Sequence, residues 1–305
     1  MPDALQRLPG GARVAVVRLR SLGDCVLTTP ALEILKQFRP DLRTAVVVED
    51  RFAPVFEGNP DVNAILPPAA SALRGWKPDL CINLHGGMRS AVLTAASGAR
   101  FRAGFAHFRA SRLYNLRIPT AQTILSVDRK VHTAEHLASA IFWLGVPRCE
   151  IPWARLFAHD AGLSLRGSYA VLHPFATGPG KAWPASGFLA IASHLRLALG
   201  LDPVFIAGPG DDTHPFAEYR CIEGAPLADV KSLLRGATLF VGNDSGPAHM
   251  AAAFGLPVLV IFGASDPVIW APWRTVSQVI VARGPIEAVA VGEVIEALER
   301  LRVAA

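Results

Sequence analysis

Short runs of apolar, mostly β-branched residues alternate along the chain with stretches whose apolar positions recur three or four residues apart. Residues 14–17 form the first such run, a polar loop follows, and residues 26–38 carry the spacing of three and four. Continuous apolar runs are typical of strands buried on both faces, whereas the wider spacing is typical of amphipathic helices. This strand, loop and helix alternation predicts an α/β fold in which helices cover a parallel sheet.

The alternation predicts further elements in two halves of the chain. In the first half we expect strands at residues 45–48, 64–66 and 80–84 and a helix at 132–144. After a polar stretch at residues 158–168 the pattern restarts. There the expected strands are 169–173, 203–207, 238–241 and 258–262, and the expected helices are 185–199, 227–235 and 247–254.

The restart indicates two doubly wound domains. We expect an N-terminal domain at residues 1–160 and a C-terminal domain at 161–285. A final helical segment, 286–305, follows. The pattern leaves open whether this segment packs back on the first domain. Doubly wound sheets bind ligands at the carboxyl ends of their strands, so two such domains facing each other would hold ligands in a central cleft.

Composition indicates a globular protein. Of the 305 residues, 51% are hydrophobic and 18% are charged, which excludes a disordered or fibrous chain. The longest uncharged stretch, Ser245–Ser265, is broken by glycines and prolines, so we expect a buried helix and strand there rather than a membrane span. The N-terminus lacks the apolar core of a secretory signal, which predicts a cytoplasmic protein. Four cysteines without a CxxC pair are expected to be buried thiols: Cys25, Cys81, Cys149 and Cys221.

Positive charge is concentrated in one segment. The net charge is only +5, yet no Asp or Glu occurs between Leu80 and Val127. Six arginines there are interleaved with aromatic residues: Arg89, Arg100, Arg102, Arg109, Arg112 and Arg117 with Phe101, Phe105, Phe108 and Tyr114. Such a mixture is expected where a surface meets phosphates, nucleic acid or lipid headgroups. A solvated basic face whose aromatic residues turn to the core explains it equally well.

The first candidate for chemistry is Ser21-Leu22-Gly23-Asp24, in the loop between the first strand and its helix. Gly23 permits a close backbone approach, and Asp24 stands at the start of a helix near the mouth of the sheet. Asp is a preferred N-cap residue, so a structural role is the simpler explanation. The functional alternative is a general base that contacts a substrate hydroxyl.

The second candidate is Gly242–His249, where another strand runs into a helix. Backbone amides at a helix N-terminus favour a bound phosphate, and His249, about one turn into the helix, could face the same ligand. In the structural alternative Asp244 caps the helix, Pro247 is its first-turn proline and His249 belongs to the core.

Two further loops follow strands. Gly178–Pro184 is rich in glycine but is not a P-loop, because Phe175 replaces the first glycine and Ala182 the Ser or Thr that would hold magnesium. Lys181 in this loop is either a cation suited to neutralising a diphosphate or an ordinary surface lysine. Asp211, after the strand at 203–207, could reach a ribose, although a plain turn fits as well.

Metal ligation is not expected. His132 and His136 match the HxxEH pattern of zinc sites, but the same residues fit an ordinary amphipathic helix. No two carboxylates lie two residues apart, so the DxD arrangement by which many sugar transferases hold a divalent metal is absent from the sequence.

Three of these segments together resemble the lipopolysaccharide heptosyltransferases of glycosyltransferase family 9. They are Val16–Leu32 (VVRLRSLGDCVLTTPAL), Lys181–Pro184 (KAWP), and Gly242–His249 followed by Ser265-Asp266-Pro267. The resemblance extends in order over essentially the whole chain. It implies a GT-B architecture, two Rossmann-like domains facing a central cleft, and inverting transfer of a heptose or related sugar from an ADP-sugar. No metal or other cofactor is implied as a requirement.

The resemblance also implies residue roles. Asp24 looks like the catalytic base of the family, and Lys181 looks like its donor-phosphate lysine. A contact to the donor ribose falls near Asp211. The donor-binding loop of the family corresponds to Asp244, Ser245, Gly246 and His249.

The implied acceptor is a lipopolysaccharide-core or other lipid-linked glycan. The arginines from Arg100 to Arg117 suit such an acidic, lipid-anchored molecule at the inner face of the cytoplasmic membrane. Peripheral contact with that membrane is therefore expected, and nucleic acid is not. The alternative from another class is a non-catalytic, basic two-domain protein that binds nucleotide or nucleic acid through Arg89–Arg117, and the presence of Asp24 argues against it.

Overall fold

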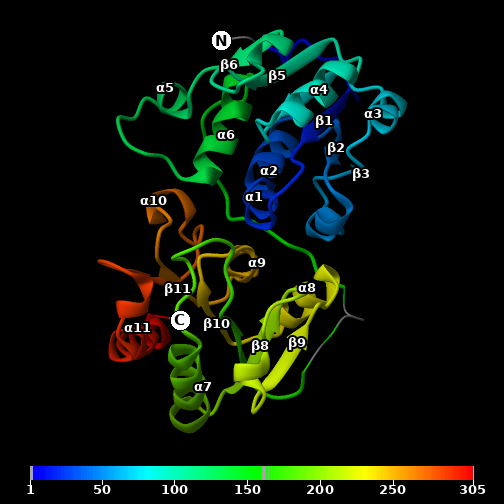
Figure 1. The fold of residues 1–305 in the computed structure, drawn as a ribbon. Helices are drawn as coiled ribbons and strands as arrows, with labels where there is room; N and C mark the ends of the chain where they lie inside the picture. Colours follow the sequence, from blue (N-terminus) through cyan, green and yellow to red (C-terminus); the bar gives the residue numbers. More distant parts are fainter. Residues whose placement is uncertain (1–2, 160–162, 164, 305) are drawn as a thin grey trace. The chain divides into compact units, whose positions relative to one another are not determined.

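The apolar runs of the first half lie side by side in one parallel sheet (Figure 1). The computed structural model describes residues 3–159, 163 and 165–304. The chain divides into two units, Met1–Phe157 and Ala158–Ala305. The first sheet has the order β3-β2-β1-β4-β5-β6, and every neighbouring pair is parallel. Its strands are β1 (Arg13–Val17), β2 (Arg43–Val47), β3 (Ala64–Leu66), β4 (Leu80–Asn83), β5 (Phe101–Phe105) and β6 (Leu116–Ile118).

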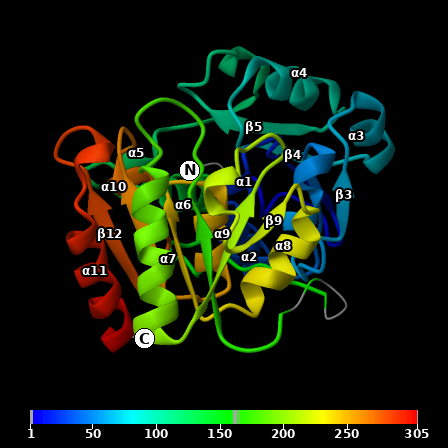
Figure 2. The same ribbon diagram turned by 60° about the horizontal axis from the view of Figure 1, so that its bottom comes forward.

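Helices cover both faces of the first sheet. On one face α3 and α4 contribute Leu73 and Leu93, which pack with Val17 and Cys81 of the strands (Figure 2). On the other face α2 and α6 pack together. The helices of this unit are α1 (Leu22–Val26), α2 (Thr29–Phe38), η1 (Asp50–Val55), α3 (Ala70–Trp76), α4 (Met88–Ala96), η2 (Ser111–Leu113), α5 (Ala121–Leu125) and α6 (Thr133–Trp143).

The second unit repeats this architecture. Its parallel sheet has the order β12-β11-β10-β7-β8-β9. The strands are β7 (Tyr169–His173), β8 (Asp202–Ala207), β9 (Arg220–Glu223), β10 (Leu239–Asn243), β11 (Val258–Phe262) and β12 (Ser277–Val281). The helices are α7 (Ala185–Leu199), η3 (His214–Phe216), α8 (Leu227–Arg235), α9 (Gly246–Ala253), α10 (Pro267–Trp270), η4 (Ile286–Ala288) and α11 (Val291–Ala304).

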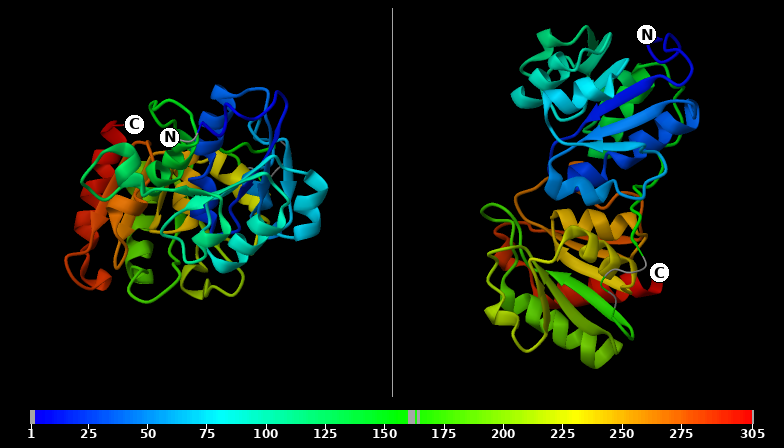
Figure 3. Two further views of the ribbon diagram at one scale, coloured as in Figure 1. Left: turned by 90° about the horizontal axis from the view of Figure 1, so that it is seen from above. Right: turned by 90° about the vertical axis from the view of Figure 1, so that its right-hand side faces the viewer.

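The final helix packs within the second unit. In the right-hand view of Figure 3, α7 and α11 lie on one side of the sheet and α9 on the other. Val294 and Leu298 of α11 are fully buried in the same cluster as Phe188 of α7 and Ile261 of β11. The apolar stripe of α11 is therefore used by its own unit.

Each sheet has one point where the strand order reverses. In the first sheet β2 lies on one side of β1 and β4 lies on the other. In the second sheet β8 lies on one side of β7 and β10 lies on the other. Loops at the carboxyl ends of β1 and β4, and of β7 and β10, therefore stand at topological switch points, where doubly wound sheets bind ligands.

Several elements differ from the expectation. The single helix expected at residues 26–38 is two helices, α1 and α2, because Pro30 stands in the first turn of α2 and cannot continue a helix from before it. Strands β5, β6, β9 and β12 were not predicted, since each carries polar residues or lies at a sheet edge with partly exposed positions. The uncharged stretch forms α9 and β11, as expected. Among the described residues, no helix combines the length and apolar character that crossing a bilayer requires.

The cysteines only partly follow the expectation. Cys25 and Cys81 are buried, and burial raises the pKa of Cys81 to about 12. Cys149 is exposed and Cys221 is half-buried. The expectation of four buried thiols is wrong for these two, because Cys149 lies in an irregular segment after α6 and Cys221 lies on the edge strand β9.

Candidate active site

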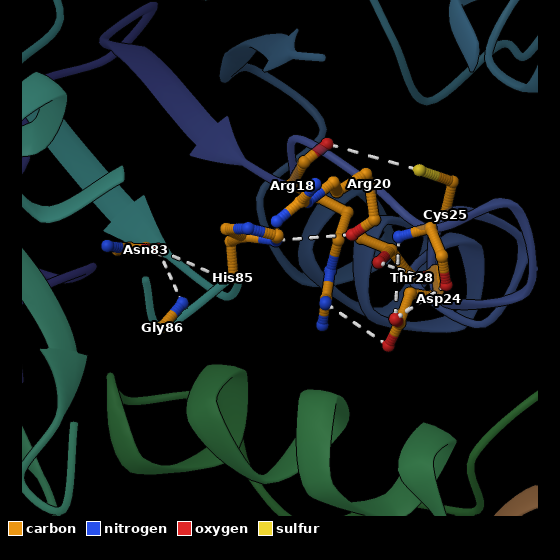
Figure 4. Close-up of polar contacts among 9 residues, drawn as sticks. Arg18, Arg20, Asp24, Cys25, Thr28, Asn83, His85 and Gly86 are labelled. Atoms are coloured by element: carbon orange, nitrogen blue, oxygen red, sulfur yellow. Dashed lines mark hydrogen bonds and ion pairs between the residues drawn. The ribbon is translucent and has the colours of Figure 1, made fainter. Parts of the chain in front are cut away.

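Asp24 lies at the switch point of the first sheet, just beyond the end of β1 (Figure 4). Its Oδ2 accepts a hydrogen bond from the Ser21 hydroxyl at 3.0 Å and from the Ser21 backbone N–H at 3.5 Å. Ser21 is the N-cap of α1 and Asp24 the third helical residue, so Asp24 is not the N-cap itself but the carboxylate that reaches back to it. The side chain remains 20% exposed, which leaves the carboxylate accessible.

A buried guanidinium holds the other oxygen of this carboxylate. Arg18 follows β1, is 5% exposed, and places Nη1 3.2 Å from Asp24 Oδ1. A charge removed from water is costly unless it is paired, so the two side chains need each other. Arg18 at one carboxylate oxygen and Ser21 at the other together fix the orientation of the Asp24 side chain.

Histidines surround this pair. His85 follows β4, and its Nδ1 lies 3.1 Å from the Arg20 carbonyl oxygen, across the switch point. Burial and the nearby Arg18 lower the pKa of His85. His136 of α6 stacks on Phe105 with ring centroids 4.0 Å apart, and burial, helped by His107 and Arg18, lowers the pKa of His136 to about 4. His85 and His136 are therefore neutral at pH 7, and the charged partner of Asp24 is Arg18.

Two of the HxxEH residues, His132 and Glu135, are engaged in capping. His132 is the N-cap of α6, and its Nδ1 accepts a hydrogen bond from the Ala134 backbone N–H at 3.1 Å. Glu135 accepts from the His132 backbone N–H at 2.8 Å and pairs with Arg129 at 2.6 Å. Within residues 3–159, 163 and 165–304, no group of three or more His, Cys, Asp or Glu side chains is placed to hold a metal ion.

The arginine-rich segment contains β5, η2 and β6. Phe101, Phe105 and Tyr114 are buried. This agrees with the interpretation of the segment as a solvated basic face whose aromatic residues turn to the core. Five of the six arginines are exposed: Arg89, Arg100, Arg109, Arg112 and Arg117.

In the second unit, Lys181 and Asp244 come together at the switch point between β7 and β10. Their charged atoms, Nζ and Oδ2, are 4.0 Å apart. The loop that carries Lys181 is anchored by Asn243, which is fully buried at the end of β10. Asn243 accepts from the Trp183 backbone N–H at 3.0 Å and donates to the Pro174 carbonyl at 2.8 Å. The loop thus has a defined position rather than swinging freely.

Ser245 is the N-cap of α9, a position that the sequence interpretation gave to Asp244. Asp244 lies one residue before it, where it meets Lys181 instead. The Ser245 hydroxyl lies 3.1 Å from Nδ1 of His173, at the end of β7. Burial lowers the pKa of His173 to about 4, so this ring is neutral at pH 7. Pro247 is in the first turn, as expected.

Two other predicted residues have structural contacts of their own. His249 is 5% exposed, within α9, and its ring centroid is 6.5 Å from that of Trp270. Asp211 follows β8, and its Oδ2 accepts from the Gly208 backbone N–H at 2.8 Å, which closes a turn. Roles for either residue toward a ligand stay predictions.

The structure thus gathers Lys181, Asp244 and Ser245 in the second unit, and Asp24 belongs to the first. Sequence reasoning assigned no role to four residues of these two groups: Arg18, His85, Asn243 and His173. Each lies at the carboxyl end of a central strand, which is the signal by which they could have been found.

Comparison with known proteins agrees with this geometry. The sequence model of glycosyltransferase family 9 (heptosyltransferase) matches residues 69–290. Lipopolysaccharide heptosyltransferase 3 of Escherichia coli K12 is 27% identical over 295 residues, which cover 84% of this chain and 83% of the relative.

Solved structures show the same fold. A glycosyl transferase family 9 structure from Veillonella parvula superposes with a TM-score of 0.83 at 22% identity, over 96% of this chain and 98% of the other. The E. coli heptosyltransferase WaaC with ADP-2-deoxy-2-fluoro heptose gives a TM-score of 0.75 at 20% identity, over 94% and 99%.

Two parallel, doubly wound units with these structural neighbours show the GT-B architecture. The chain belongs to glycosyltransferase family 9, the heptosyltransferase family. The predicted fold class and family are confirmed, and the comparisons lend no support to a non-catalytic binding protein.

Proposed function

We propose that this chain transfers a heptose, or a closely related sugar, from an ADP-sugar to a lipopolysaccharide-core or other lipid-linked glycan, with inversion at the anomeric carbon. The family match over residues 69–290 supports this, as do relatives named as lipopolysaccharide heptosyltransferases. WaaC was solved with a fluorinated ADP-heptose, which supports the donor class. The observation that carries the proposal is a partly exposed carboxylate at one switch point and a cation beside a helix N-terminus at the other.

The second unit would hold the donor diphosphate. Lys181 and the first backbone amides of α9 supply a cation and a positive dipole end, which together favour a doubly charged group. In the absence of donor, Asp244 serves as the counterion of Lys181. The neutral His173 fixes the Ser245 hydroxyl at the start of the helix. Gly246 allows the backbone to approach the ligand closely, and contacts from His249 and Asp211 complete the proposed donor site.

Asp24 would serve as the general base. As the acceptor oxygen bonds to the anomeric carbon, its proton passes to Asp24 and the bond from that carbon to the diphosphate oxygen breaks, releasing ADP. Arg18 and Ser21 each occupy one side of the carboxylate, and each oxygen keeps a lone pair for the acceptor hydroxyl. The charge that develops on ADP is stabilised by Lys181 and the α9 amides.

The acceptor in this proposal is acidic and lipid-anchored, and the protein works in the cytoplasm at the inner face of the cytoplasmic membrane. Exposed arginines without neighbouring acidic residues in sequence support an anionic partner. The step as written needs neither a cofactor nor a divalent metal, because Lys181 and the backbone amides of α9 stabilise the charge of the diphosphate.

The direct test is to incubate the purified protein with ADP-heptose and a heptose-deficient lipopolysaccharide. We expect ADP release, an acceptor mass increased by one heptose, and an inverted anomeric configuration by NMR. UDP- and GDP-sugars serve as donor controls, and the reaction should persist with EDTA. Tight ADP binding without transfer to any lipid-linked glycan would refute the proposal.

A further inference from the structure

Three large apolar side chains lie exposed on one side of the first unit. Met88 and Val92 of α4 are 55% and 52% exposed, and Leu113 of η2 is 38% exposed. Met88 and Val92 are four residues apart in the helix and therefore share a face. Helix α4 and η2 contact each other, so Leu113 lies beside that helix. We call these three residues the α4–η2 patch.

The fold does not need this face of α4. The buried face of the helix is formed by other residues, among them Ser90, Leu93 and Thr94. Leu93 joins the core cluster, and Ser90 accepts a hydrogen bond from the buried Asn83. Figure 2 shows α4 on the outside of the sheet, with β5 beneath it. Single exposed apolar side chains are common, but neighbouring ones that the fold does not use are typical of surfaces that meet another molecule.

The loop beside the patch is held in place. The Phe108 ring lies against Gly86, so closely that a β-carbon at Gly86 would collide with it. Gly86 precedes α4 by two residues, which fixes the loop before η2 against the N-terminus of the helix. The loop that leads to Leu113 therefore has a defined place beside the start of α4.

The charge around the patch is positive. Arg109, in the loop before η2, and Arg112, in η2, are exposed, and the segment from Leu80 to Val127 contains no Asp or Glu. Arg89 is next to Met88 and 61% exposed; it lies 3.4 Å from Glu49, which offsets part of its charge. A few exposed apolar side chains with arginines next to them in the chain match the boundary between anionic headgroups and acyl chains. Three residues are few for a stable protein–protein interface, which buries about 1,200–2,000 Å².

We infer that the α4–η2 patch docks this protein on an anionic lipid bilayer, with Met88, Val92 and Leu113 entering the headgroup boundary and the arginines binding lipid phosphates. The inference rests on the proposed function, which places the acceptor glycan on a membrane lipid. The docking surface begins three residues after His85, whose Nδ1 contacts the loop before Asp24. Docking through α4 would therefore bring that loop to the membrane face of the unit, where a lipid-linked glycan emerges.

Vesicle sedimentation tests the surface. The wild type should sediment with vesicles of phosphatidylcholine and phosphatidylglycerol, and less with phosphatidylcholine alone. Met88→Ser with Val92→Ser should lower partitioning about tenfold, because two apolar side chains no longer enter the boundary. Arg109→Ser with Arg112→Ser should lower it by a similar factor at low salt and flatten its salt dependence. Leu197→Ser, which removes an 83% exposed leucine in the second unit, is the matched control and should bind as the wild type does.

A second measurement separates docking from chemistry. The Met88→Ser, Val92→Ser variant should keep its melting temperature and its transfer to a delipidated, water-soluble acceptor, and lose transfer only to acceptor in vesicles. Wild-type sedimentation by this variant would overturn the docking surface. So would self-association of the wild type that the variant abolishes, since the patch would then join two copies of this chain. Absence of wild-type transfer to both the soluble acceptor and the acceptor in vesicles would instead refute the proposed function.

Discussion

The ammonium group of Lys181 lies near Asp244 but forms only a weak ion pair with it. The two charged atoms are 4.0 Å apart and the Lys181 side chain is 35% exposed, so the pair adds little to stability. A diphosphate presents more charge than one carboxylate and would be the stronger partner. The cation is thus better explained by a ligand than by the fold.

Lys181→Ala should therefore weaken ADP binding by about 1.5–3 kcal/mol, the contribution of a charged hydrogen bond, with little change in melting temperature. Isothermal titration calorimetry measures the affinity. Arg196→Ala removes another cation of the second unit, one that is 3.7 Å from Asp202, and serves as the control. Unchanged ADP affinity in Lys181→Ala would remove this residue from the donor site.

The pH dependence of stability should report the buried histidines. Burial lowers the pKa of His136 to about 4, below its ordinary value near 6.5. Between these values the unfolded chain binds the proton more readily than the folded one, so stability falls as the pH drops from about 6.5 to about 4. His173 acts in the same direction.

His136→Phe isolates one of these contributions, because a phenyl ring can keep the stack on Phe105 without titrating. We expect the melting temperature of the variant to fall less steeply than that of the wild type between pH 7 and pH 4.5. Differential scanning calorimetry at several pH values gives both slopes. Equal slopes would show that His136 is not held neutral by the fold.

At the scale of elements, the Lys181 loop depends on the strand ends around it. Gly263, after β11, lies so close to this loop that a β-carbon there would collide with the Gly180 carbonyl oxygen. The same carbonyl accepts a hydrogen bond from the Ala264 backbone N–H at 3.1 Å. Added volume at Gly263 must therefore shift the loop that positions Lys181.

Gly263→Ala should lower ADP affinity and melting temperature together, since one methyl group displaces both the loop and its hydrogen bond. Gly284→Ala is the matched control, because open space surrounds a β-carbon at that exposed glycine. Thermal shift with and without ADP measures both effects. A Gly263→Ala protein with wild-type affinity and stability would mean that the loop does not rest on β11.

The elements that sequence reasoning found are those whose burial leaves a clear pattern. Strand β11 and helices α7 and α8 have the bounds expected from apolar runs and helical spacing. Strand β5 was hidden because Arg102 interrupts its apolar run and invites a surface interpretation. Edge strand β12 was hidden because one side of an edge strand lacks a neighbour and tolerates polar residues.

The candidate site was predictable only in part. Asp24 and Lys181 were found because each lies in a loop directly after a predicted strand, and the family resemblance then implied their roles. Arg18 and His173 were missed because their importance comes from contacts, with Asp24 and Ser245 respectively, between residues that sequence spacing alone does not bring together. The N-cap of α9 was misplaced by one residue, since Asp and Ser are comparable capping residues.

At the scale of the whole molecule, the two units divide the proposed reaction. The first carries the carboxylate and the second the cation and helix terminus, and each has its own sheet and hydrophobic core. A change confined to the Asp24 contacts should therefore leave ADP binding intact. This separation makes one substitution a clean test of the central claim.

That measurement is the rate of sugar transfer by Asp24→Asn. Asn has the size of Asp but cannot accept the acceptor proton, so turnover should fall by about a hundredfold to ten-thousandfold while ADP affinity stays within about twofold of the wild type. Arg18 loses its anionic partner, so the melting temperature also falls and the assay must be run well below it. Ser21→Ala, which removes the cap but keeps the carboxylate, should retain most of the turnover. Transfer by Asp24→Asn at more than about a tenth of the wild-type rate would contradict the account.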